Sequence, residues 1–507
     1  MVSQQEDPSP SEDSHGSSLT EHLLENLEGQ SSVNIQDTEY DTNLKPSRMF
    51  WSHIFQIITM TLPISATFLL VYLATSIGLM FAGHIRTATG EEQQYILAGV
   101  SLGTMFANVT GFSLLIGLSS AVETLASQYN GASDFKRVGH IFQRSVAILS
   151  CICVPIIFVW LFTEKILIFL GQDPLPAAVA GDIVRIRVMS LPFEVYNTSF
   201  EKYLQAQGVV RPAMWSSICE IITLLVFNTL FIHILKLSYI WLSVSFVLAD
   251  CCSTIVMTSL AFRYSEVRQT FSGVWSRESL QGWKQFFRLG VPGALMICLE
   301  WWCFELLVLF AGIVGTQHAA AMAIVYQTIA LAYMIPLGLS IATSSLVGNA
   351  LGANQPKLAR QFGRAALCLI FAIEIVVGLL IYFGRELWVK AFTSDVEVVK
   401  LASETLPITA AFVLLDGMCG VSAGILRGSG KQYFGAIINF WAYYPFGIPF
   451  AFFLTFKLHL DIQGLMVGIG TANALQSLIF LAYVSLVKWE NSTAIKQPER
   501  TLSRSYI

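Results

Sequence analysis

Two glutamates and two tryptophans stand together in an otherwise apolar stretch, CLEWWCFELLVLF, at residues 298–310. Glu300 lies near the centre of the apolar segment 286–312, where an ionised carboxylate costs about 2.5–3.5 kcal/mol to insert into a bilayer. Burial disfavours the charged form of a carboxyl, so a group of this kind can hold a proton near neutral pH and exchange it for a cation. These residue types therefore predict proton or cation exchange inside a membrane.

A second central acid, Asp416, lies in the middle of the apolar segment 403–427. Intramembrane acids usually face a cavity or a polar partner, and they are functional candidates by default. Glu300 and Glu305 are five residues apart, which places them about 140° apart around a helix. They cannot both point at one site. We therefore predict that Glu300 and Asp416 bind protons or substrate, while Glu305 lines an entrance or bonds to a neighbouring helix.

The tryptophan pair and the remaining intramembrane acids each allow two interpretations. Trp301 and Trp302 either offer an aromatic wall to a cationic substrate, through cation–π attraction, or take part in ordinary helix packing. Glu123 is close to a predicted loop, so it is an inner-gate or a packing residue. We interpret the other acids of this kind as structural: Glu220, Asp250 and Glu374.

The composition places the chain in the membrane class. Of its 507 residues, 54% are hydrophobic and 13% are charged, whereas soluble domains carry about 25% charged residues. The net charge of −4 argues against a nucleic-acid partner. The sequence has no Walker loop, no metalloprotease motif and no nucleophile elbow, and its nine cysteines lack zinc-finger spacing. We therefore expect no enzyme activity, no cofactor and no metal site, and an ion gradient as the energy source.

Twelve apolar segments are long enough to cross a bilayer as helices, which takes about 20 residues. The segments are 55–84, 97–128, 139–162, 184–207, 213–235, 238–262, 286–312, 318–350, 362–384, 403–427, 433–456 and 463–487. The fourth carries five charged residues, so it must face protein or water. Lys and Arg are concentrated in the loops on the side of the termini, which predicts that both termini are cytoplasmic. We expect the membrane to be the plasma membrane or that of a vacuole or another acidic organelle.

An internal repeat divides the chain into two halves. GLSSAVETLASQYNGASDFK at 117–136 matches GLSIATSSLVGNALGANQPK at 338–357, at an offset of 221. LQAQG at 204–208 matches LRGSG at 426–430, at an offset of 222. Each half holds six spans, an even number, so both halves start on the same side of the membrane and the repeats are parallel.

The repeat defines the predicted organisation, an all-α integral membrane protein of twelve transmembrane helices in two parallel six-helix repeats. The expected parts are a polar cytoplasmic tail with disorder-like composition at 1–49, an N-lobe at 50–262, a cytoplasmic linker at 263–285, a C-lobe at 286–487 and a cytoplasmic tail at 488–507.

The two halves differ in their acids. At an offset of 229, the counterpart of Glu300 is Val71. The counterpart of Glu305 is Ser76 at the same offset. A carboxylate needed only for the fold gives no reason for this asymmetry, so the C-lobe is predicted to hold the chemistry.

Four motifs in order resemble the multidrug and toxic compound extrusion (MATE) transporters. They are ETLASQYNGA at 123–132, CLEWWCFELL at 298–307, VGNALGA at 347–353 and GILRGSGKQYFGAIIN at 424–439, and the second is similar to eukaryotic members. The resemblance covers residues 50–487. It implies two six-helix bundles that face each other in a V within the lipid bilayer, with rocker-type alternating access in a monomer.

The resemblance also implies a site. It carries the family's C-lobe acids over onto Glu300, Glu305 and Asp416, although eukaryotic members often hold a glutamate in place of Asp416. Gln327 stands where animal members of the organic-cation type have a glutamate, which removes one negative charge. Span one, 55–84, lacks the aspartate of the sodium-type bacterial branch, so protons are the expected coupling ion. Further candidates are Tyr326, Asn439 and Tyr443, followed by Glu123, Gln128 and Glu194.

The expected function is therefore proton-coupled antiport of organic cations, drugs or polar metabolites. One alternative is a lipid-linked precursor flippase of the wider superfamily, which would need a large cationic cavity, whereas the intramembrane charges here are mainly acidic. Another is a membrane receptor or sensor with a transporter-like body, which would usually carry a larger folded extra domain than the polar segment 1–49.

Overall fold

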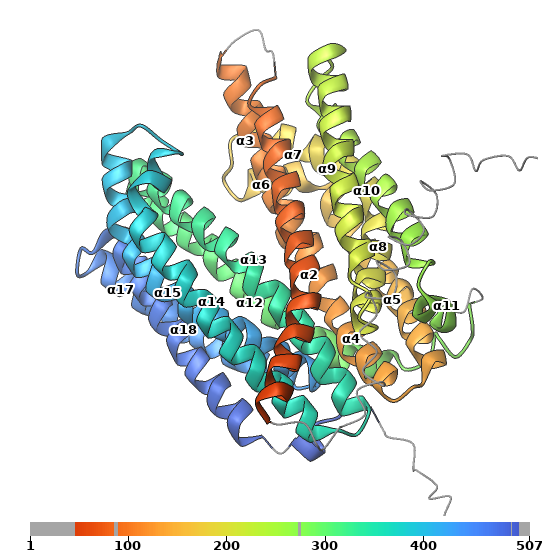
Figure 1. The fold of residues 1–507 in the computed structure, drawn as a ribbon. Helices are drawn as coiled ribbons and strands as arrows, with labels where there is room; N and C mark the ends of the chain where they lie inside the picture. Colours follow the sequence, from red (N-terminus) through yellow and green to blue (C-terminus); the bar gives the residue numbers. More distant parts are fainter. Residues whose placement is uncertain (1–45, 86–89, 272–274, 488, 496–507) are drawn as a thin grey trace, which may run out of the picture.

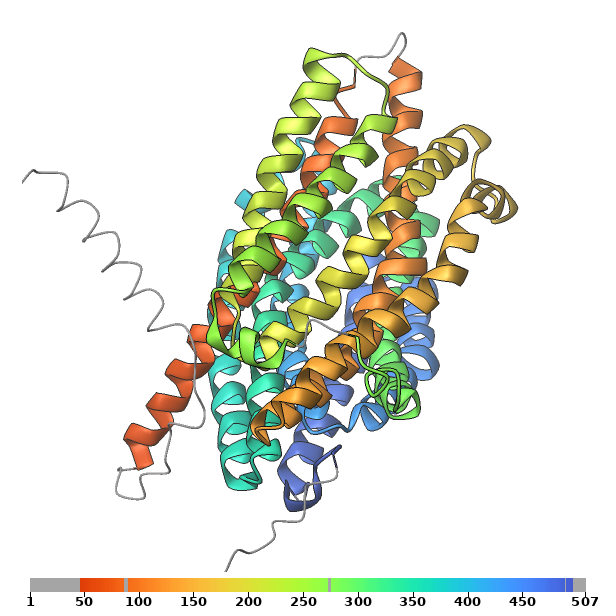
Figure 2. The same cartoon turned by 90° about the vertical axis from the view of Figure 1, so that its right-hand side faces the viewer.

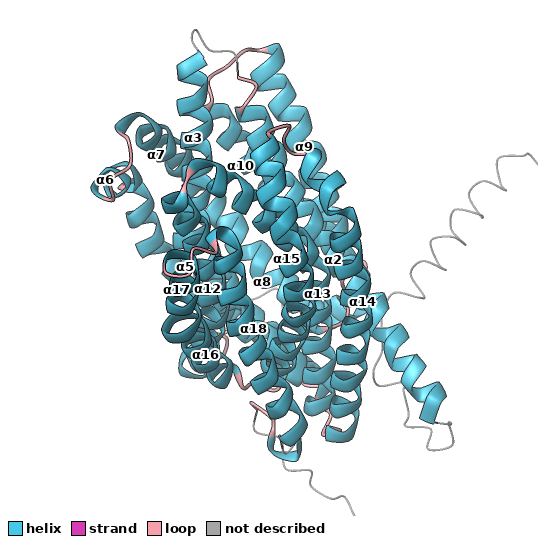
Figure 3. Cartoon of the chain, turned by 90° about the vertical axis from the view of Figure 1, so that its left-hand side faces the viewer, coloured by secondary structure: helices cyan, strands magenta, loops and turns pink. Residues whose placement is uncertain are grey.

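The computed structural model describes residues 46–85, 90–271, 275–487 and 489–495, and the regular secondary structure of these residues is helical throughout (Figure 3). Within them, 11 helical segments are long and apolar enough to cross a membrane. A twelfth helical rod, at 174–206, is the charged fourth span of the sequence prediction. Every predicted span is therefore found as helix.

The helices follow the order that the apolar segments predict. The N-lobe contains α2 (Pro46–Ala82), α3 (Gly90–Ala107), η1 (Asn108–Phe112), α4 (Ser113–Gly131), α5 (Phe135–Leu161), α6 (Thr163–Phe169), α7 (Pro174–Arg187), η2 (Val188–Ser190), α8 (Leu191–Ala206), α9 (Arg211–Asn228), η3 (Thr229–Ile234) and α10 (Ile240–Ala261). The C-lobe contains α12 (Trp283–Val314), α13 (Thr316–Gly352), α14 (Pro356–Lys390), α15 (Val396–Gly428), α16 (Gln432–Trp441), η4 (Ala442–Gly447), α17 (Ile448–Phe456) and α18 (Asp461–Leu486). In the chain, the short helix α11 (Ser265–Thr270) comes between the two lobes, and η5 (Trp489–Asn491) follows α18.

The fourth span is a rod of two helices, α7 and α8, joined by the 3₁₀ turn η2. It begins at Pro174 rather than at the predicted residue 184. Its charges contact protein, as expected. Arg185 lies 2.8 Å from a carboxylate oxygen of Glu164 and 2.9 Å from one of Asp182. Charged residues such as Asp182 and Arg185 make the rod more polar than the other 11 segments.

The two lobes meet at one end and diverge toward the other, which gives the molecule the outline of a V (Figure 1). We call the meeting point the closed end; α4, α13 and α15 finish there, at Gly131, Gly352 and Gly428. Seen from the side, the long helices of both lobes run along a common direction (Figure 2). At the closed end α4 packs against α12 and α13 of the other lobe, and α2 also packs against α13.

Glycines at equivalent positions of the repeat let the two lobes touch backbone to backbone. A Cβ atom on Gly131 would collide with the carbonyl oxygen of Asn349, and one on Gly352 would collide with that of Gln128. Gly131 and Gly352 are 221 residues apart, and so are Gln128 and Asn349. The contact is therefore reciprocal, and the axis that relates the two repeats passes through the closed end.

The tails are described only in small part. Of the predicted N-terminal tail 1–49, the structure describes the last four residues, and of the C-terminal tail 488–507 it describes 489–495. The linker 263–285 is described except at 272–274. Its Glu278 lies 3.0 Å from the ammonium group of Lys136 on α5, a contact between exposed side chains.

Candidate functional site

The centre of α12 carries Glu300 into the C-lobe. The Glu300 carboxylate is partly buried, and its charge acts on those of Asp416 and Arg427. Within the described part of the chain, no side chain forms a hydrogen bond or an ion pair with it. Glu300 is therefore a carboxylate near a second acid and without a fixed partner, which suits it to bind an ion or a substrate group.

Asp416 lies in the middle of α15, is 5% exposed, and has a charge that acts on Glu300. Its Oδ1 accepts a hydrogen bond of 2.8 Å from the side-chain amide of Asn473 on α18. The Ser477 hydroxyl, one turn further along α18, donates to the Leu415 carbonyl oxygen at 2.9 Å. These contacts hold the Asp416 side chain in place. The Glu300 side chain has no such contact among the described residues, so it is free to bind a proton or a substrate group.

Buried amides connect the helices around the two acids. The Asn439 side chain on α16 donates to the Met296 carbonyl oxygen of α12 at 2.9 Å and accepts from the Gln476 amide of α18 at 2.7 Å. Asn439 was predicted from the sequence, whereas Asn473 and Gln476 were not. A spacing of three and four residues among Asn473, Gln476 and Ser477 puts these polar groups on one face of an apolar helix, and this spacing could have revealed them.

Two tyrosines complete the surroundings of the acids. Tyr443, in the π-helical turn η4, is fully buried, and its hydroxyl lies 3.5 Å from the Asn473 amide nitrogen. The charges of Glu300 and Asp416 act on both Tyr443 and Tyr333 of α13. Tyr333 was not predicted. We name the set of Glu300, Asp416, Tyr333, Tyr443 and Asn473 the C-lobe cluster.

Glu305 lies outside this cluster, as its angle around the helix predicts. Its charge acts on Tyr326 of α13, and the Tyr326 ring lies 6.2 Å from that of Phe304. The adjacent Gln327 is partly buried and has no side-chain hydrogen bond within the described residues. Glu305 and Tyr326 thus form a second group in the same lobe, nearer the divergent end of α12 than Glu300.

The tryptophan pair stays open to both interpretations. Trp301 and Trp302 are partly buried. The indole nitrogen of Trp302 is buried without a hydrogen-bond partner within the described residues. No cation within those residues stacks on either ring.

The secondary candidates Glu123 and Gln128 belong to the closed end. The Glu123 carboxylate is 2% exposed and lies 3.3 Å from both Lys202 of α8 and Arg427 of α15. The side-chain amide of Gln128 donates to the Gly428 carbonyl oxygen at 2.9 Å. Arg427 lies in the last turn of α15, which runs on to Gly428, and its side chain is buried. These residues join the lobes and are not part of the C-lobe cluster.

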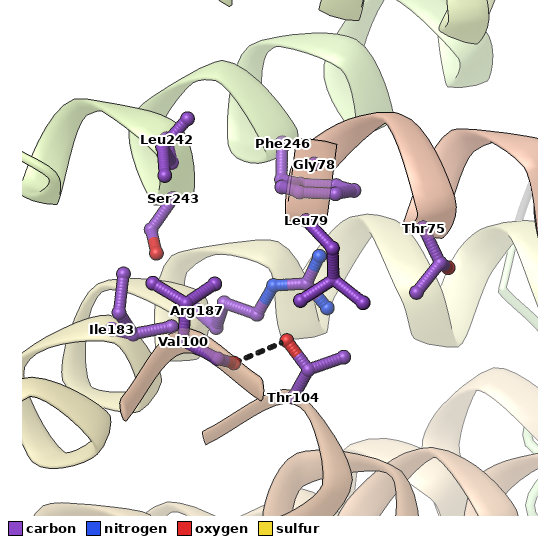
Figure 4. A pocket seen from close by; sticks show the side chains of 10 residues that line it. All are labelled: Thr75, Gly78, Leu79, Val100, Thr104, Ile183, Arg187, Leu242, Ser243 and Phe246. Atoms are coloured by element: carbon purple, nitrogen blue, oxygen red, sulfur yellow. Dashed lines mark hydrogen bonds between the residues drawn. The ribbon is translucent and has the colours of Figure 1, made fainter. Parts of the chain in front are cut away.

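Glu194 belongs to a separate charged region of the N-lobe. It accepts a hydrogen bond of 3.1 Å from Thr198, and its charge acts together with those of Arg187, Asp250 and Glu220. The Arg187 guanidinium lies 4.1 Å from the ring centre of Phe246 and extends into a small cavity (Figure 4). The cavity is lined by Thr75, Gly78, Leu79, Val100, Thr104, Ile183, Arg187, Leu242, Ser243 and Phe246. Its lining holds no carboxylate, in contrast to the C-lobe cluster.

Similarity to known proteins covers most of the chain. A family model described as MatE matches residues 63–230 and 292–453. Multidrug and toxin extrusion protein 1 of Oryctolagus cuniculus is 34% identical over 443 residues, 87% of this chain and 76% of that protein. The Homo sapiens protein of the same name is 34% identical over 427 residues, 84% of this chain and 73% of that protein. The crystal structure of the eukaryotic MATE transporter AtDTX14 matches with a TM-score of 0.81 and 29% identity, covering 87% of this chain and 98% of that one. The predicted V-shaped fold is confirmed by this match.

Proposed function

The chain belongs to the MatE family of membrane transporters, and on this premise we propose that it is a proton-coupled antiporter that extrudes organic cations, drugs or polar metabolites. It is an efflux transporter in a lipid membrane, since its relatives are extrusion proteins and not enzymes. The coupling ion, the exchange mechanism and the class of substrate are the parts that we propose.

The observation that supports proton coupling is the pairing of Glu300 with Asp416 in the C-lobe. The two carboxyls are close enough for their charges to interact. Ionising both of two neighbouring carboxyls that are buried away from water costs much free energy. The pair therefore needs either a proton or a cation. Because one excludes the other, binding of a cationic substrate displaces a proton, and binding of a proton displaces the substrate.

We infer a transport cycle from this competition. With the divergent end facing outward, a proton binds to Glu300 or Asp416 and the substrate leaves to the outside or to a lumen. The lobes then separate at the closed end, which we place on the cytoplasmic side, so the site releases its proton and takes up new substrate. The Asn473 hydrogen bond to Asp416 keeps one carboxyl in position while the other changes partner.

Transport in reconstituted vesicles tests the proposal. Proteoliposomes with an acidic interior are placed in a sodium-free, more alkaline buffer that contains labelled tetraethylammonium, a simple organic cation. We expect uptake that rises with the imposed pH difference and stops when a protonophore removes it. Uptake that requires sodium, or that does not depend on the pH difference for any cation tested, would contradict proton coupling.

A further inference from the structure

A fourth acid of the C-lobe, Glu374, has no hydrogen-bond partner among the residues that the structure describes. Glu374 on α14 is 0% exposed, and neither of its carboxyl oxygens has a hydrogen-bond partner within the described residues. From the sequence we interpreted it as structural. A structural carboxyl in a membrane helix would bond to a neighbouring group, as Glu123 does at the closed end. The absence of such a bond points to a different role.

The position of Glu374 places it directly behind the C-lobe cluster. It packs against Gly417 of α15, the residue that follows Asp416. A Cβ atom on Gly417 would lie 2.6 Å from the Glu374 Cγ and 2.8 Å from its Oε1, far too close for a real contact. The lack of a side chain at Gly417 is therefore what allows the carboxyl to approach α15, and the charge of Asp416 acts on it there.

The surroundings of Glu374 leave the neutral carboxyl as its stable form in this state. Helices α13 and α2 also pack against α14 and bring Tyr326, Tyr333 and Tyr72 into the membrane, but none of them hydrogen-bonds to the carboxyl. No Lys, Arg or His within the described residues forms an ion pair with it. An isolated carboxylate buried in this way would be very costly, so the group holds a proton.

We propose that Glu374 is a further proton-binding residue of the transporter, which exchanges its proton through Asp416 so that each transport cycle moves two protons. In the exchange, the O–H bond of Glu374 breaks and an O–H bond forms on the ionised Asp416 carboxylate, which has already released its own proton; no electrons are transferred. The inference rests on the proposed proton antiport and adds the number of protons that are moved in each transport cycle.

The proton stoichiometry is measured by finding the substrate gradient that a fixed pH difference can hold. Proteoliposomes are clamped at zero membrane potential with valinomycin and equal potassium, and the tetraethylammonium ratio that gives no net flux is determined. One pH unit should hold a ratio of about 100-fold in the wild type and about 10-fold in Glu374→Gln, since each coupled proton contributes about a factor of ten. Glu374→Asp keeps a titratable group and should retain the wild-type ratio.

The controls separate this inference from the function on which it rests. Glu386→Gln, a matched change at an exposed position of α14, should leave the ratio unchanged. A wild type without any response to pH would overturn the proposed function itself. A wild type that holds only a 10-fold ratio, or an equal ratio in wild type and Glu374→Gln, would overturn the role of Glu374 alone. If Glu374→Gln does not fold, a wild-type ratio of only about 10-fold still contradicts the role of Glu374.

Discussion

At the scale of single residues, the chemistry depends on how differently two neighbouring acids are held. Asp416 accepts a hydrogen bond from Asn473, while Glu300 has no bonded partner within the described residues. The depth of both acids in apolar spans is what marks them in the sequence. Asn473 and Tyr333 were not predicted, because an uncharged polar residue in an apolar helix is common and costs far less to bury than a carboxylate.

Glu300→Gln and Glu305→Gln compare the two acids of α12 as matched isosteric changes. Because only Glu300 interacts with Asp416, Glu300→Gln should reduce pH-driven uptake by at least about 100-fold, the size expected when a group essential to proton transfer is removed. Glu305→Gln should retain most of the uptake. Initial rates of tetraethylammonium uptake, normalised to protein in the vesicles, measure both. Equal losses of pH-driven uptake in the two variants would show that Glu305 is as important for transport as Glu300.

At the scale of helices, the closed end is held by charges that sequence reasoning did not bring together. Glu123, Lys202 and Arg427 come from α4, α8 and α15, and all three are buried. The predicted span 403–427 ends at Arg427, and the pattern of apolar residues gave no sign that this charge is buried and paired rather than solvated. Helix ends are hard to predict from apolar patterns because the apolar run ends before the helix does. A charged last turn therefore resembles a loop.

Removing the acid at the centre of this group should loosen the closed end. Glu123→Gln leaves Lys202 and Arg427 buried without their counter-charge, and breaking a buried pair in this way costs about 3–5 kcal/mol. We expect a clearly lower unfolding temperature in detergent. The control Glu278→Gln, which removes an exposed contact to Lys136, should change it little. An unchanged unfolding temperature in Glu123→Gln would show that the ion pairs do not hold the lobes together.

At the scale of the whole molecule, the duplication made the two-lobed fold predictable. Matches at offsets of 221 and 222 imply parallel lobes, and the reciprocal contacts of Gly131 and Gly352 follow the same offset. The conformation could not be predicted, because a repeat is compatible with lobes that meet at either end. Only packing in three dimensions places the contacts at the ends of α4, α13 and α15.

A cross-link across the closed end tests whether the lobes must separate there. The side chains of Asn130 and Asn349 are joined by a hydrogen bond of 2.8 Å. In a cysteine-free background, we expect Asn130→Cys with Asn349→Cys to lose transport when a short thiol cross-linker is added, and to recover it when the link is cleaved. Each single cysteine variant serves as a control. Full transport by the cross-linked protein would contradict alternating access through this end.

Exchange of a cation for protons at Glu300 and Asp416 is tested most directly by following protons while only a substrate gradient is imposed. Proteoliposomes with a trapped pH indicator start at equal pH on both sides in sodium-free buffer, and tetraethylammonium is added outside. We expect the interior to become alkaline as the cation enters, and we expect Glu300→Gln and Asp416→Asn to abolish this change. Entry of the cation without any change in interior pH would contradict this exchange.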